Sequence, residues 1–102
     1  MVLTEARRQF VWSTSTLDIA LTVWADAYAQ DALCLDGQVL PHDNAAFSAT
    51  VSLLIEGVAV ARTTTDIDGF FAFEGLDHGN YDFQLATTTS TIVAGPIPIC
   101  ER

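Results

Sequence analysis

Acidic side chains gather in the stretch TTTDIDGFFAFEGLDHGNYDFQL, at residues 63–85. Carboxylate oxygens are the ligands that calcium prefers, and Asp66, Asp68 and Gly69 follow one another as in the start of a calcium-binding loop. Such a loop needs more oxygen ligands at alternate positions and a glutamate at its twelfth, whereas the mostly aromatic run Phe70–Phe73 comes next. The spacing therefore predicts a solvated turn and no metal site.

Thiol and imidazole groups are zinc ligands, and the chain has them at Cys34, His42, His78 and Cys100. Structural zinc sites take their ligands in closely spaced pairs, but these four residues are far apart in the sequence. We expect packed thiols and solvated turn histidines instead. The two thiols are predicted to be reduced in a cytosolic protein, and one disulfide between them is the alternative in an exported one.

Nucleophilic catalysis has little support in the sequence. Serine and threonine are frequent, yet there is no G-x-S-x-G motif, and only two histidines could act as bases. His78 follows Asp77 in a turn-like context, where a solvated side chain is the simpler expectation. We predict no catalytic residue, no cofactor and no enzymatic activity.

Charge is strongly unbalanced, with 13 acidic residues against four arginines, no lysine, and a formal net charge of −9. This balance disfavours binding to nucleic acid or to anionic membrane surfaces, because both carry the same sign of charge. The absence of lysine excludes Schiff-base chemistry and a lysine isopeptide bond. A basic partner protein would be attracted.

No apolar run approaches the roughly 20 residues that span a bilayer, and the N-terminal segment lacks the continuous apolar stretch of a secretory signal. The sequence therefore predicts a cytoplasmic protein by default. An extracellular location is the alternative if a signal has been removed.

Alternating apolar and polar residues dominate the chain, and no segment after Gly37 has a sustained helical period. The pattern predicts a single all-β sandwich domain over residues 1–102, with seven to eight antiparallel strands. Residues 24–34 are expected to form a loop. The predicted strands occupy residues 8–13, 17–25, 35–41, 49–55, 58–65, 67–76, 79–88 and 90–100. We expect the strands at 67–76 and 79–88 to pair, and the last to lie at an edge because of its glycine and prolines.

Turns between these strands are predicted at four structural residues. Glycine accepts positive φ, so Gly57, Gly69 and Gly79 are expected to reverse the chain, and Asp66 opens the turn that contains Gly69. In this interpretation the rings around the turns fill the core, and the carboxylates remain in water.

The run VSLLIEGVAVARTTTDIDGFFAFEGLDHGNYDFQL resembles carboxypeptidase regulatory-like domains and the related collagen-adhesin B-type repeats. The residues that carry the resemblance are Thr65, Asp66, Gly69, Phe71, Phe73, Leu76, Gly79 and Tyr81. The resemblance implies a prealbumin-like (transthyretin-like, immunoglobulin-like) sandwich with its regulatory-like core at residues 33–100 and residues 1–30 as an N-terminal strand extension. That N-terminal part is more loosely similar to small actinobacterial regulatory-like proteins encoded beside sigma factors.

Members of these families act mostly as spacers, stabilising modules or protein-binding domains, so the resemblance implies a role without catalysis. The hydroxyisourate hydrolases, enzymes with the same fold, end in Tyr-Arg-Gly-Ser, whereas this chain ends in PIPICER. Hydrolase activity is therefore not expected.

Open sheet edges and large aromatic side chains predict a protein-protein interaction or structural assembly module. The partner would be another protein or a second copy of the chain. Trp12, Trp24 and Tyr28 are the expected contact residues, and the uncharged segment 86–94 is a candidate for edge pairing. The alternative is a calcium- or carbohydrate-binding module that uses acidic turns and exposed aromatics.

Overall fold

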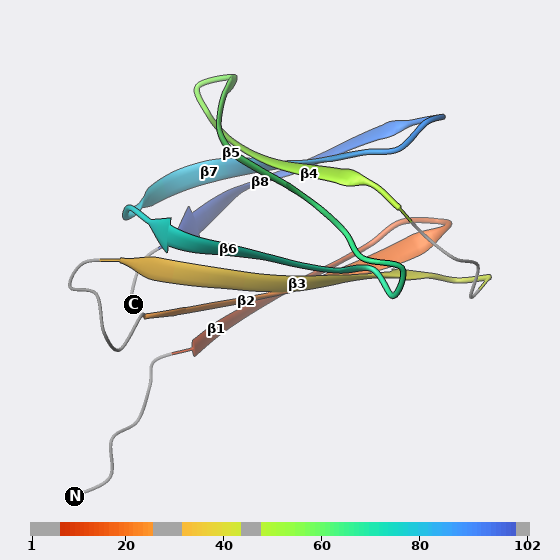
Figure 1. Ribbon diagram of the computed structural model, residues 1–102, viewed down its shortest axis with the longest axis horizontal. Coiled ribbons are helices and arrows are strands. Elements are labelled where there is room, and N and C mark those ends of the chain that lie inside the picture. The colour runs from red at the N-terminus through yellow and green to blue at the C-terminus, as the bar shows by residue number, and fades with distance from the viewer. Residues whose placement is uncertain (1–6, 26–31, 44–47, 100–102) are drawn as a thin grey trace, which may run out of the picture.

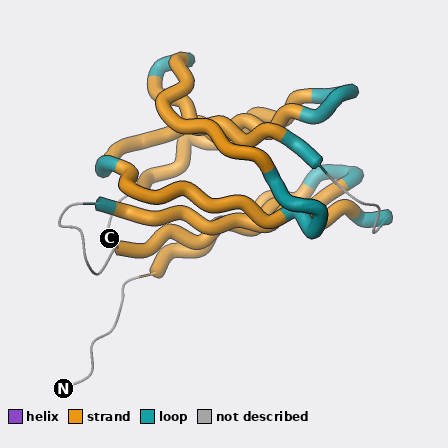
Figure 2. Tube along the Cα trace, in the orientation of Figure 1, coloured by secondary structure: helices purple, strands orange, loops and turns teal. Residues whose placement is uncertain are grey.

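The computed structural model describes residues 7–25, 32–43 and 48–99, which form strands and connecting turns without a helix (Figures 1 and 2). The predicted all-β class is confirmed. Eight strands follow one another along the chain: β1 Arg7–Ser13, β2 Leu17–Ala25, β3 Leu33–Pro41, β4 Thr50–Ile55, β5 Val58–Thr64, β6 Phe70–Leu76, β7 Gly79–Ala86 and β8 Thr91–Ile99.

The strands form two four-stranded antiparallel sheets, which Figure 1 shows as two layers. Sheet A has the order β1-β2-β3-β6, and sheet B has the order β5-β4-β7-β8. The last strand lies at an edge of sheet B, as its prolines predicted. Because β5 belongs to sheet B and β6 to sheet A, the chain crosses between the layers after β5 and again after β6.

The core lies between the layers and is built from alternate residues of the strands. In β2 the predicted apolar face is buried, from Leu17 to Val23. Phe83 of β7 lies at the centre: it is fully buried, and its ring centroid is 6.2 Å from that of Trp12 and 5.8 Å from that of Phe71. Each fully buried ring or branched aliphatic side chain contributes about 1.5 to 3 kcal/mol relative to exposure.

The N-terminal strands belong to the same sandwich as the segment from residue 33 onward. β2 is hydrogen-bonded to β1 on one side and to β3 on the other, with Ile19 opposite Trp12 and Val39. Its side chains supply part of the common core. Residues 7–25 therefore supply two of the four strands of sheet A.

Two of the predicted turns have the expected backbone. Glu56 and Gly57 connect β4 to β5 with φ values of 51° and 81°, the two successive positive values of a tight hairpin turn. Gly69 has a φ of 84°, and its amide donates to the carbonyl of Asp66 at 3.0 Å. Val39 in turn donates its amide to the Gly69 carbonyl at 2.9 Å, which ties this turn to β3.

The structure differs from the prediction between β6 and β7. These strands do not pair with each other: β6 pairs with β3, and β7 lies between β4 and β8. Gly79 is the first residue of β7, opposite Ile99, and Asp77 and His78 make the connection. The rings still meet as expected because they face each other across the sandwich, but the segment between them crosses from one sheet to the other.

Candidate protein-interaction surface

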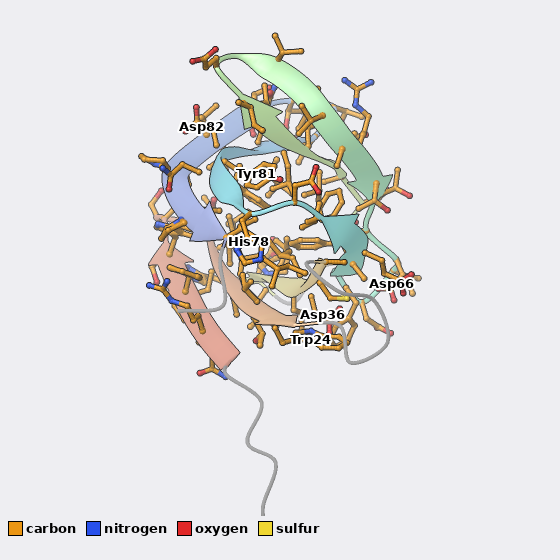
Figure 3. All side chains as sticks on the ribbon, turned by 90° about the vertical axis from the view of Figure 1, so that its left-hand side faces the viewer. Trp24, Asp36, Asp66, His78, Tyr81 and Asp82 are labelled. Carbon is orange, nitrogen blue, oxygen red and sulfur yellow. The ribbon has the colours of Figure 1, made fainter. Side chains whose placement is uncertain are left out.

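The two tryptophans predicted as contact residues lie on opposite faces of sheet A. Trp12 lies opposite Ile19, which is buried, so its ring faces the core and is stacked with Phe10 and Phe83 at centroid distances of 6.2 Å. Trp24 lies on the outer face, where its Nε1 donates to Asp36 Oδ2 at 3.2 Å (Figure 3). Tyr28 lies outside the described residues.

The separation follows from the register of the β1–β2 hairpin. Its paired residue numbers have a constant sum, as in Arg7 with Trp24 and Trp12 with Ile19. An even-numbered residue of β1 therefore shares a face with an odd-numbered residue of β2. Trp12 and Trp24 are both even and must point to opposite sides, so they do not form one aromatic patch.

The acidic turn at Asp66 is held together by its own backbone. Asp66 Oδ1 accepts hydrogen bonds from the amides of Asp68 and Phe70, both at 2.9 Å, and the Asp66 amide donates to the Phe70 carbonyl. This Asx-type arrangement gives the carboxylate a structural role. Among the described residues, no three acidic, histidine or cysteine side chains are grouped so that they could hold a metal ion.

A shallow groove of about 490 Å³ lies at the end of the sandwich where the β7–β8 turn meets the start of β2. Hydroxyl and aliphatic groups, including Thr87–Ser90, line it together with Asp43, without an aromatic ring on which a sugar face could stack. Nearby, His42 Nε2 lies 3.1 Å from Asp18 Oδ1. Hydrogen bonds from His42 and then Ser13 hold the pKa of Asp18 below its ordinary value.

Four strands lie at sheet edges, and they are protected unequally. Pro96 and Pro98 remove two amide donors from the second half of β8, which blunts that edge. β6 carries an exposed carboxylate at Glu74, and β1 begins with the pair Arg7-Arg8. Charges and prolines of this kind oppose the addition of another strand.

The edge of β5 is interrupted by a bulge at Val60 and carries little other protection. It contains neither proline nor an acidic residue, and its one charged residue is Arg62. Val58 is 64% exposed and Val60 is 52% exposed. Two exposed valines on an edge strand favour pairing with another polypeptide.

The register between β4 and β5 shifts at a bulge: Leu53 lies opposite Ala61 but Leu54 lies opposite Ala59, so the extra residue is Val60 of β5. Bulges increase the local twist. Figure 1 shows the β4–β5 hairpin rising away from the rest of sheet B. The tip therefore extends past the core, and Val58 and Val60 are exposed.

A second feature lies on the same side of the molecule, where the edges of β5 and β6 meet. An open groove of about 590 Å³ is lined by Asp36, Gly37, Thr63, Thr64, Asp66, Phe70, Phe71 and Ala72. Phe70 is 51% exposed and lines this groove together with Asp36 and Asp66. Figure 3 labels these two carboxylates, from β3 and from the turn before β6.

None of the interaction features on this side was singled out from the sequence. The signal for β5 was the uncharged run Val58–Ala61, in which valine and alanine alternate, directly after a tight turn in a chain with many acids. The groove left no local signal, because Asp36 and Asp66 are brought together only by the pairing of β3 with β6.

Comparison with known proteins finds no family model, curated protein or solved structure that matches the chain. The resemblance to carboxypeptidase regulatory-like domains therefore stays a prediction based on the motif from Thr65 to Tyr81. The described residues include no apolar helix of the length needed to cross a membrane.

Proposed function

We propose that this protein is a non-catalytic protein-binding module that adds an extended segment of another polypeptide to the free edge of β5. The observation that supports this function is the exposure of Val58 and Val60 on an edge strand with no proline or acidic residue. An added strand would satisfy the free backbone groups of β5 by ladder hydrogen bonds, and the valines would provide apolar contact.

Strand addition suits a small domain with little concave surface. Backbone hydrogen bonds give affinity without a deep pocket, and the side chains of alternate residues give selectivity. The strong net charge of −9 would keep the free protein dispersed in spite of its exposed apolar edge.

The test is selection of binders from a random peptide display library, with sedimentation velocity on the same protein to detect self-association. Val60→Glu places a charge that strand addition would have to desolvate, so the affinity for selected peptides should fall by about tenfold or more. Val93→Glu is the matched control, because Val93 is 66% exposed on β8 and the change in net charge is the same.

The Val93→Glu protein should keep its affinity for the peptides within about twofold. A protein that selects no peptide and sediments as a monomer would contradict the proposed function. Equal losses of peptide affinity in the two variants would show that the peptides do not bind specifically at the edge of β5.

A further inference from the structure

We infer that the groove between β5 and β6 selects partner segments that carry an arginine side chain, seated on Phe70 between Asp36 and Asp66. This inference rests on the proposed function and names the chemistry of its partner. The groove lies beside the C-terminal half of β5, since Thr63 and Thr64 form part of its lining. A segment that pairs with β5 would pass directly over it.

Two carboxylates line the groove, and neither of the arginines with a described side chain does. Arg62 points to the outer face of sheet B, where its Nε donates to Ser52 Oγ at 3.3 Å. Arg8 lies over the Phe10 ring on β1, at the other edge of sheet A. A partner cation would therefore meet negative charge that these two arginines do not neutralise.

Both carboxylates are held in position before a partner arrives. Trp24 Nε1 donates to Asp36 Oδ2, and the amides of Asp68 and Phe70 donate to Asp66 Oδ1. Fixed acceptors lose little conformational freedom on binding, which favours affinity. A guanidinium group has five donors in a planar fork and can bond to carboxylates on either side of it.

Phe70 supplies the apolar surface that the rest of an arginine side chain needs. Phe70 is half exposed and lines the groove together with Asp36, Asp66 and Ala72. A guanidinium group stacks on an aromatic face through cation–π attraction, and its methylene stem can cover apolar surface. The exposed aromatic ring distinguishes this groove from the groove at the end of the sandwich, which is lined by Asp43 and hydroxyl groups but by no aromatic residue.

Charge also distinguishes a basic partner from a second copy of the chain. Each copy carries a formal net charge of −9, so two copies repel each other at long range. A basic segment is attracted over the same distance, with a faster association rate at low ionic strength. We therefore assign the groove to a basic partner and not to self-association.

The experiment compares peptides selected on the wild-type protein with their binding to Asp36→Asn/Asp66→Asn. Asparagine keeps the oxygen that accepts from the backbone at Asp66 and from Trp24 at Asp36, so the turn is retained while two charges are removed. Asp77→Asn/Asp82→Asn is the matched control, with the same change in net charge at residues outside the groove. Melting temperatures establish that both variants fold.

Selected peptides should share an arginine flanked by β-prone residues. We expect the groove variant to bind them about tenfold or more weakly, the control variant within about twofold, and replacement of the peptide arginine by neutral citrulline to cause a similar loss. That loss should shrink as salt is raised.

Peptides without a basic residue, or equal binding to the groove variant, would overturn the inference. If those peptides are still lost in Val60→Glu, strand addition to β5 stands and only the basic specificity fails. If the protein forms a dimer that Val60→Glu disrupts and the groove variant does not, the partner of β5 is a second copy of the chain and not a basic segment. A library that yields no binder, with a monomeric protein, would overturn both proposals.

Discussion

Gly69 is held in a backbone conformation and a space that other residues do not fit. Its φ is 84°, and a Cβ at this position would overlap the carbonyl oxygen of Val39. The same carbonyl group belongs to the residue whose amide donates to Gly69, so the turn and β3 are packed backbone to backbone. The glycine is required here by geometry, whatever the function of the turn.

Gly69→Val should lower the free energy of unfolding by about 3 kcal/mol or more, because it combines left-handed strain with a steric overlap. Chemical denaturation measures the loss. Gly79→Ala is the control: a Cβ there would meet only Tyr81 Cε1, at the ordinary distance of 3.7 Å, and we expect a change below about 1 kcal/mol. A Gly69→Val protein as stable as the wild type would contradict the turn geometry.

Tyr81 joins the start of β7 to the connection before it. Its side chain is buried, and its hydroxyl donates to the carbonyl of Asp77, four residues earlier, at 2.7 Å. Burial and then the negative charge of Asp77 raise the pKa of Tyr81 above its ordinary value. This bond fixes the segment that carries the chain from sheet A back to sheet B.

Tyr81→Phe leaves the Asp77 carbonyl without this partner and should cost about 1 to 3 kcal/mol at neutral pH. Because the folded pKa is raised, the wild-type stability should be complete below pH 10 and fall as the pH rises through the folded value. Thermal melts from pH 8 to 11.5 would measure both effects. In Tyr81→Phe the stability should fall less with rising pH, because the phenol that titrates is absent. An equal fall in the two proteins would contradict the raised pKa of Tyr81.

At the scale of the elements, the β1–β2 hairpin assigns different roles to the two tryptophans. Trp12 closes one side of the core against Phe83, and Trp24 orients Asp36 on the outer face. We therefore expect the first to matter for stability and the second for the position of a groove carboxylate.

Trp12→Ala should destabilise the fold by about 3 kcal/mol, since it removes a large ring that is packed on the core. Trp24→Ala should cost less, about 1 kcal/mol, because it removes a partly exposed ring and one hydrogen bond. Urea denaturation of the two variants compares them directly. A larger loss for Trp24→Ala would mean that the hairpin register is shifted by one residue.

Edge protection is also decided at this scale. Pro96 and Pro98 remove amide donors from β8, while the bulge at Val60 interrupts the pairing of β5 with β4. The sequence indicated the protection of β8, because a proline lacks an amide donor wherever it lies in a strand. The bulge in β5 became visible only from the pairing of β4 with β5.

At the scale of the whole molecule, the excess of acidic residues sets the response to ions. Carboxylates that repel one another destabilise the compact state, and salt screens this repulsion. Any cation should therefore raise the melting temperature modestly, whether or not a specific site exists.

A specific calcium site would raise the melting temperature further, by an amount that grows with calcium concentration. We expect millimolar calcium chloride to raise the melting temperature no more than magnesium chloride at the same concentration. A thermal-shift titration with the two salts measures this difference. An increase specific to calcium, lost in Asp66→Asn, would favour the alternative of a cation-binding module.

The sequence determined the strands, the buried faces and two of the turns, because alternation and positive φ are properties of a few neighbouring residues. Leu17, Ile19, Leu21 and Val23 could be assigned to the core in this way, as could the reversal at Glu56-Gly57. Acidic charge and the absence of lysine were also fixed by composition alone.

Only the tertiary structure decided which strands are neighbours and which surfaces they share. The crossing after β6 put Asp77 and His78 in the connection in place of Gly79, the hairpin register separated Trp12 from Trp24, and the pairing of β3 with β6 brought Asp36 near Asp66. Strand pairing depends on contacts between residues far apart in the chain, and a shift of one residue reverses every side chain. Local pattern therefore specifies what each strand buries, whereas the edges and grooves available to a partner depend on how all the strands pair.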